Sequence, residues 1–182
     1  MPPLDVKRRT SALVVLAVVV LLIELGATYG SVSGDRFAPV AQWGLTRPTD
    51  GFAFALVVIG CGALCFLGRF PLPSSAVATA SYVAFALRDY ELGMFLPPMV
   101  VVFVLVARRG ARLAAALCAL VSLAAGLVWV SHRAGTLADS GTALLTWVAF
   151  GTVLAVFFVV PFLLGEIVRL RSLLRSGGNR AA

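Results

Sequence analysis

The sequence predicts an all-α, polytopic bundle of about six transmembrane helices, and three observations carry this prediction. Sixty per cent of the 182 residues are hydrophobic and 13% are charged, whereas soluble domains are about half apolar and a quarter charged. Apolar segments follow one another along the chain, and basic residues gather between alternate pairs of them. The net charge of +7 therefore reflects how the chain is oriented in a membrane. We expect no nucleic-acid partner.

Six apolar segments are separable, and each is expected to form a helix: 11–30, 51–68, 74–88, 92–107, 112–131 and 142–168. A transmembrane helix needs about 20 residues, within a range of about 17–25. The first, fifth and sixth segments reach this length, whereas the third and fourth are short. Six full crossings and a re-entrant hairpin built from the third and fourth segments both remain open. The rest of the chain divides into an N-terminal tail (1–10), a long outer loop (31–50) and a basic C-terminal tail (169–182).

The distribution of basic residues predicts that both termini face the cytoplasm. If the N-terminus is inside, eleven of the fifteen basic residues fall on the inner side, namely Lys7, Arg8, Arg9, Arg69, Arg108, Arg109, Arg112, Arg169, Arg171, Arg175 and Arg180. The outer side then holds only Arg36, Arg47, Arg88 and Arg133. Membrane proteins concentrate basic residues on the cytoplasmic side. We therefore expect a multi-pass protein of the bacterial plasma membrane.

Several features predict local helix geometry. Pro97 and Pro98 lie early in the fourth segment, so a helix beginning near Leu92 would be kinked there, and a later start would make the stretch partly re-entrant. Asp50 and Asp139 are predicted to cap the second and sixth helices. Small residues recur every four positions in the fifth segment and predict a face for close helix packing in lipid: Ala114, Cys118, Ser122 and Gly126.

Glu24 is the candidate functional residue, because it is the one carboxylate well inside an apolar run. An ionisable group in a membrane is costly and usually faces a partner or a water-filled cavity. We expect a sensor or proton-linked role with a partner such as Arg88 or Arg133. The simpler interpretation is a carboxylate near the outer interface that is hydrated or structural. Glu166, near the inner boundary, is predicted to pair with Arg169.

No catalytic, cofactor or metal site is predicted. Cys61 and Cys65 share a helix face, but no histidine or second cysteine pair accompanies them to complete a zinc site. Small apolar packing is the simpler interpretation of both. His132 is the only histidine, with no Ser–Asp or metal constellation around it. We therefore expect neither enzyme activity nor a cofactor.

The stretches GALCFLGRFPLPSSAVATASYVAF (62–85), PPMVVVFVLVARRGARLAAALCAL (97–120) and LLGEIVRLRSLLR (163–175) follow one another in the chain. In this order they resemble the N-terminal membrane module of actinobacterial sensor histidine kinases that are paired with LuxR-type response regulators. In that family the last helix continues into a dimerising helix with a phosphoacceptor histidine, and then into an ATPase domain. These 182 residues contain neither segment, so we do not expect the kinase activity to carry over.

The resemblance implies a module of two-component signal transduction that lacks catalytic domains. Such a module would act through its last helix, on a separate signalling partner or within a homodimer. One alternative is a small transporter or channel component that uses Glu24 as its coupling or gating group. Another is a structural membrane subunit. The lipid bilayer is the expected partner in every case.

Overall fold

The structure, a computed structural model, describes residues 3–34, 38–39, 43–44, 46–91 and 93–178, with their side chains from residue 11 to residue 175. The regular elements in this part of the chain are all helical. The helices are α1 (Pro3–Ser33), α2 (Gly51–Phe66), α3 (Pro71–Leu87), α4 (Leu96–Val104), α5 (Arg112–Ala134) and α6 (Ser140–Gly178), and a π-helical turn, η1 (Leu105–Arg109), continues α4. The predicted all-α fold with six helices is confirmed.

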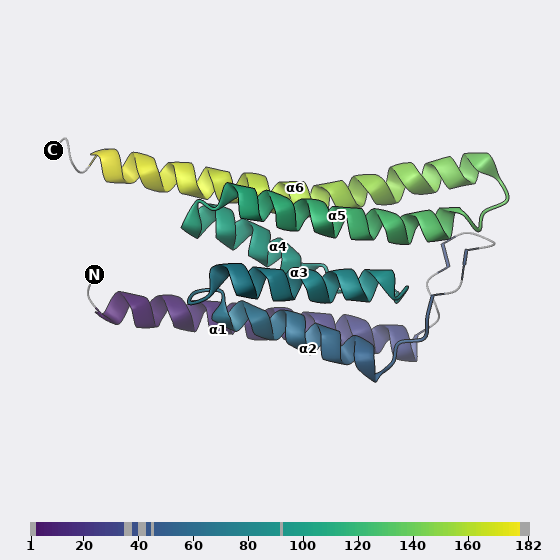
Figure 1. Cartoon of the computed structure of the whole chain (residues 1–182), viewed down its shortest axis with the longest axis horizontal. Helices are drawn as coiled ribbons and strands as arrows, with labels where there is room; N and C mark the ends of the chain where they lie inside the picture. The colour runs from purple at the N-terminus through teal and green to yellow at the C-terminus, as the bar shows by residue number, and fades with distance from the viewer. Residues whose placement is uncertain (1–2, 35–37, 40–42, 45, 92, 179–182) are drawn as a thin grey trace.

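The helices lie side by side, and both chain termini are at the same end of the bundle (Figure 1). We call this the arginine end, because it carries the α2–α3 turn at Arg69 and the end of η1 at Arg108 and Arg109. The opposite end, with the described residues 46–50 before α2 and 135–139 before α6, is the loop end. The central helix, α3, packs against α2, α4 and α5.

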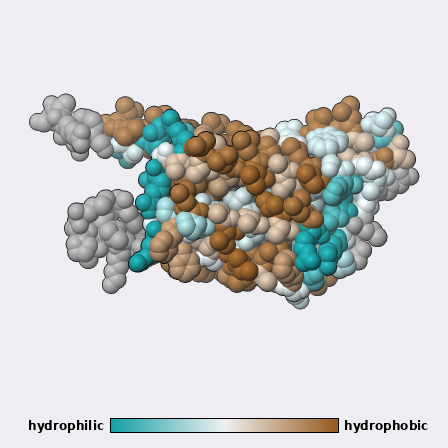
Figure 2. Space-filling model, in the orientation of Figure 1, coloured by the Kyte–Doolittle hydropathy of each residue, from teal (hydrophilic) through white to brown (hydrophobic). Residues whose placement is uncertain are grey.

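Three helices are long and apolar enough to cross a membrane: Ser11–Ser33 within α1, Arg112–Ala134, which is α5, and Ser140–Arg175 within α6. Large apolar side chains on these helices point outward, and Val15, Leu22 and Leu145 are 62%, 65% and 68% exposed. Figure 2 shows a hydrophobic band on the surface with hydrophilic patches toward both ends. Apolar surface on this scale requires lipid or a protein partner. The chain is an integral membrane protein.

Two helices extend by two turns or more beyond the apolar segments that predict them. α1 begins at Pro3 rather than at residue 11, and α6 runs to Gly178 rather than to residue 168. Leucine, lysine and arginine are strong helix formers, so leaving the apolar run does not end either helix. The predicted tails are therefore largely helical within the described residues.

The fourth helix corrects the predicted kink at Pro97 and Pro98. α4 begins at Leu96, so both prolines lie in its first turn, where a missing N–H removes no helical hydrogen bond. The described residues just before it, 91 and 93–95, are non-helical, so the predicted start at residue 92 is too early. α4 starts in the middle of the bundle and runs to the arginine end (Figure 1). The chain after α3 thus turns back into the bundle, as a partly re-entrant stretch does.

Aspartates begin two of the helices, as predicted. Asp50 accepts hydrogen bonds from the backbone N–H groups of Phe52 and Ala53, at 3.0 and 3.1 Å. Asp139 accepts one from the N–H of Thr142 at 2.6 Å. Both caps satisfy first-turn donors that have no acceptor within the helix. They fix where α2 and α6 start at the loop end.

Candidate functional site: a buried carboxylate at the start of α4

Glu24 lies inside the bundle and caps the N-terminus of α4. Its residue is 3% exposed. Oε2 accepts a hydrogen bond from the backbone N–H of Met94 at 2.7 Å, and Oε1 accepts one from the N–H of Leu96 at 2.8 Å. Because Leu96 is the first residue of α4, the carboxylate lies at the positive end of the helix dipole. Each carboxylate oxygen satisfies a backbone donor that α4 itself leaves without an acceptor.

These bonds explain how a carboxylate stays in an apolar interior. Inserting an acidic side chain at the centre of a transmembrane helix costs about 2.5–3.5 kcal/mol on insertion scales. Hydrogen bonds to charged groups contribute about 1.5–3 kcal/mol each, so two of them offset this cost. The burial excludes the hydrated form of the simpler interpretation, whereas its structural form, a carboxylate that only supports the fold, is compatible with the same two bonds.

Both arginines that were predicted as partners of Glu24 bind other groups. Arg133, on α5, forms a salt bridge with Asp89 in which Nη2 and Oδ1 are 2.5 Å apart. The guanidinium of Arg88 lies over the ring of Phe52, 4.4 Å from its centroid. The groups bound to Glu24 are backbone N–H groups, which every residue except proline possesses, so residue types gave no signal of them.

Met94 connects Glu24 to α2. Its φ of 63° is in the left-handed region, which costs a non-glycine residue about 1–3 kcal/mol. Its side chain is fully buried, and its Cε atom is 2.3 Å from where a Cβ atom would lie at Gly60. The missing side chain at Gly60 therefore makes the room that Met94 occupies. The hydrogen bond to Glu24 and the packing of the side chain against Gly60 of α2 together hold Met94 in its strained conformation.

α4 and η1 pack closely on α6 at Gly165. A Cβ atom there would lie 2.8 Å from the Cβ of Val106 and 3.1 Å from the carbonyl oxygen of Phe103. Carbon atoms in contact are normally about 3.5–4.0 Å apart, so only glycine permits this approach. Single-turn π-helical segments such as η1 are frequent at functional sites. A movement of α4 must therefore move α6 or open a gap between them.

The small-residue face of α5 brings three helices together at Gly126. A Cβ atom there would lie 3.0 Å from the Cδ1 of Leu154 on α6 and 3.0 Å from the hydroxyl oxygen of Tyr82 on α3. Ser122 is fully buried, whereas Ala114 and Cys118 are half-buried. The close approach of α3, α5 and α6 is therefore concentrated at the part of the small-residue face that lies nearer the loop end.

Glu166 joins α5 to α6 at the arginine end. Arg112 donates from Nε and Nη2 to its two carboxylate oxygens at 2.6 and 2.7 Å, and Arg169 donates from Nη2 at 3.0 Å. The predicted pair of Glu166 with Arg169 is confirmed. The sequence does not predict the bidentate bond to Arg112, because it joins residues 54 positions apart. It fixes geometry more than it stabilises, since the Arg112 side chain is 56% exposed.

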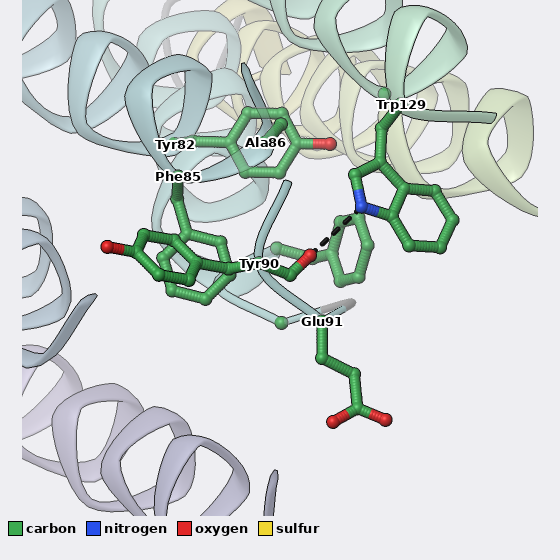
Figure 3. Close-up of a pocket in the computed structure, with 9 residues that line it drawn as sticks. Tyr82, Phe85, Ala86, Tyr90, Glu91 and Trp129 are labelled. Atoms are coloured by element: carbon green, nitrogen blue, oxygen red, sulfur yellow. Dashed lines mark hydrogen bonds between the residues drawn. The ribbon is translucent and has the colours of Figure 1, made fainter. Parts of the chain in front are cut away.

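A cavity of about 10 Å³ lies between α3, α5 and the segment before α4, with room for about one water molecule. Its walls are mainly aromatic, from Tyr82, Phe85, Tyr90, Phe95 and Trp129. Figure 3 shows Trp129 bound to the backbone of Tyr90, where Nε1 donates to the carbonyl oxygen at 2.9 Å. Small-molecule sites are usually about 300–1,000 Å³, so this cavity is not assigned as a ligand site.

Tyr90 also binds the cap of α2. Its hydroxyl donates to Oδ1 of Asp50 at 2.6 Å. This hydrogen bond holds the pKa of the Asp50 carboxyl below its ordinary value. Burial, and then the same hydrogen bond, raises the pKa of the Tyr90 hydroxyl. The loop between α3 and α4 is thus tied to the start of α2.

Metal chemistry has no assembled donor set in the part of the chain that the structure describes. No three His, Cys, Asp or Glu side chains gather there in a group that would hold an ion. Cys61 is buried and Cys65 half-buried, and both are free thiols.

No protein-family model, curated protein or solved structure matches the chain. The candidate site is therefore defined by its geometry, with Glu24, Met94 and Gly60 at one end of α4 and Gly165 at the other.

Proposed function

We propose that the chain is a membrane sensor module that passes a signal to a separate protein through α6. The observation that carries this proposal is the capping of α4 by Glu24, together with the packing of η1 against Gly165. A carboxylate in the membrane is thereby connected to the helix that leaves the bundle at the arginine end. The resemblance to the membrane modules of actinobacterial sensor histidine kinases supports a place in a two-component system.

The signal would begin with a change in the hydrogen bonds of Glu24. An ionised carboxylate accepts from both donors, whereas a protonated one turns one acceptor oxygen into a donor hydroxyl. Losing the bond to Met94 removes one of the two contacts that hold this strained residue. α4 would then shift, and packed helices respond by changing between discrete arrangements. α6 carries that change to the arginine end.

The proposal puts the arginine end in the cytoplasm, because basic residues concentrate there. A reporter that is active only in the cytoplasm, fused after residue 182, is expected to be active. A reporter that is active only outside the membrane is expected to be silent at the same position. The reverse pattern would contradict the proposed orientation.

A photo-crosslinking experiment in native membranes tests the signalling role. A photoreactive amino acid replaces Leu174, which is 77% exposed on the last turns of α6. The matched control replaces Leu145, which is 68% exposed on the same helix at the loop end. Position 174 is expected to capture a histidine kinase or response regulator, in a yield that Glu24→Gln changes. Capture of the same proteins at both positions would count against a signalling role, and so would a crosslinking yield that Glu24→Gln leaves unchanged.

A second function is favoured by the shape of α4. Transporters place their sites at discontinuous helices whose half-helix ends face ionised groups near the bilayer midplane, and Glu24 faces such an end here. In this alternative Glu24 is the coupling or gating group of a proton pathway through the bundle. Purified chain in proteoliposomes with an imposed pH gradient is then expected to move protons, and Glu24→Gln to abolish the movement. No proton flux above that of empty liposomes would remove this alternative.

A further inference from the structure

The turn between α2 and α3 meets the end of η1, and arginines gather at this junction. Nη2 of Arg109 donates a hydrogen bond to the carbonyl oxygen of Gly68, which brings its guanidinium beside the neighbouring residue, Arg69. Arg108 precedes Arg109 on η1, and all three arginines are exposed. Two elements that are forty residues apart in the chain thus present positive charge together.

This charge is not neutralised within the described side chains. The ion pairs found among them involve Arg47, Arg112, Arg133 and Arg169, and none involves the three arginines at the junction. Glu166, the acid described at this end, is bound by Arg112 and Arg169. The junction is therefore ready to bind an anion.

Exposed apolar side chains flank the same turn. Phe66, Phe70 and Leu72 are 60%, 50% and 58% exposed. The guanidinium of Arg69 lies over the ring of Phe70, 5.4 Å from its centroid. A ligand at this place meets guanidinium groups and, next to them, an apolar surface that continues onto α2 and α3. A headgroup phosphate attached to acyl chains has both properties.

We propose that this junction binds an anionic phospholipid. Its phosphate contacts the guanidinium groups of Arg69, Arg108 and Arg109, and its acyl chains lie along Phe66, Phe70 and Leu72. Guanidinium groups bind phosphate through paired N–H donors. Basic sites between transmembrane helices at the cytoplasmic boundary bind anionic headgroups in this way. A zwitterionic headgroup adds a cation that the same arginines repel, so charge complementarity favours an anionic lipid.

The inference rests on the proposed cytoplasmic orientation of the arginine end but not on a signalling role, and it has a consequence for α4. Arg109 is the last residue of η1, and Val106, in the same turn, packs on Gly165 of α6. A lipid held by Arg109 therefore acts on the element that joins α4 to α6. Anionic lipid content would then alter how α4 and α6 pack.

The test compares lipid binding by the purified full chain in mixed micelles that contain phosphatidylglycerol or phosphatidylcholine. The junction variant is Arg69→Gln with Arg108→Gln, which spares the Arg109–Gly68 hydrogen bond. The matched control is Arg47→Gln with Arg88→Gln, which removes the same charge from the loop end. The junction variant is expected to bind phosphatidylglycerol roughly 30-fold more weakly than wild type. The control is expected to bind it as wild type does.

Three results would overturn the inference. The first is that the junction variant and the control variant lose the same amount of phosphatidylglycerol binding. The second is that wild type binds phosphatidylglycerol and phosphatidylcholine equally well. The third is that glycerol phosphate competes fully with phosphatidylglycerol, which would reveal a site for a free anion. Helix content by circular dichroism checks that both variants are folded. If the junction variant is unfolded, Phe70→Ser with Leu72→Ser replaces it, and an unchanged affinity for phosphatidylglycerol would then be the contradicting result.

Discussion

The carboxylate of Glu24 accepts a hydrogen bond from the backbone N–H of Leu96 at 2.8 Å, so the first helix of the chain caps the fourth. Non-helical backbone at membrane depth is tolerated only where protein or a polar cavity satisfies its donors and acceptors. Glu24 supplies such acceptors to the segment that precedes α4. A carboxylate that is costly to bury is thus what permits α4 to begin inside the bundle.

We predict that Glu24→Ala lowers the free energy of unfolding by about 3 kcal/mol, because it leaves two buried N–H donors without an acceptor. Glu24→Gln is expected to lie between Ala and wild type, since its amide oxygen still accepts one bond. Thermal unfolding in detergent measures both changes. Leu22→Ala, at a side chain that is 65% exposed on the same helix, serves as the control and should change stability much less. A melting temperature for Glu24→Ala equal to that of wild type would contradict the capping role.

The sequence reveals the helices of this protein better than its site. Apolar runs and the cap residues Asp50 and Asp139 predict five helices to within about one turn at their loop-end boundaries. The start of α4 was misplaced, because its position depends on a carboxylate seventy residues away and not on local pattern. Glu24 stood out as a charge among apolar residues. The sequence gives no such signal for Met94, Gly60 and Gly165. Methionine and glycine are ordinary components of transmembrane segments, and the roles of these three residues come from packing.

The contact between α6 and η1 leads to a comparison of two glycines on the same helix. We predict that Gly165→Ala destabilises the fold by about 1–3 kcal/mol, because the added methyl group meets Val106 and the backbone of Phe103. At Gly151 the nearest atom to an added Cβ is 3.9 Å away. Gly151→Ala should therefore be neutral or stabilise by about 0.5–1 kcal/mol, since alanine is the better helix former. Equal melting temperatures for the two variants would show that the close approach is not maintained.

Arg133 ties the loop end together, and its loss should release the long loop. This side chain is 3% exposed. It binds Asp89 and donates a hydrogen bond to the carbonyl oxygen of Gly44. We predict that Arg133→Met costs roughly 2 kcal/mol, below the value for fully buried pairs because Asp89 is 37% exposed.

Limited chymotrypsin digestion checks the release of the loop. Cleavage after Trp43, which is 6% exposed and precedes the Gly44 carbonyl that Arg133 binds, should be faster in Arg133→Met than in wild type. Arg88→Met removes an exposed arginine of the same end that contacts Phe52, and it should leave the cleavage rate unchanged. If both variants are cleaved at the same rate, Arg133 does not hold the loop.

The bond from Tyr90 to Asp50 makes stability depend on pH. Because this bond lowers the pKa of Asp50 in the folded protein, it stabilises the fold above the unfolded-state pKa of about 3.9. The stabilisation is lost as the pH falls through the lower folded-state pKa. Tyr90→Phe removes the hydrogen bond, so it raises the folded-state pKa of Asp50 toward its ordinary value. The loss of stability between about pH 5 and pH 2 should therefore be smaller in Tyr90→Phe than in wild type. Asp50→Asn should remove the contribution of this carboxyl altogether. Melting temperatures across that range measure the difference. The pKa of Asp139 is likewise lowered, by its hydrogen bonds with Thr142, but neither substitution touches it, so its contribution is common to all three proteins. Parallel curves for wild type and Tyr90→Phe would mean that the hydroxyl does not stabilise the Asp50 carboxylate.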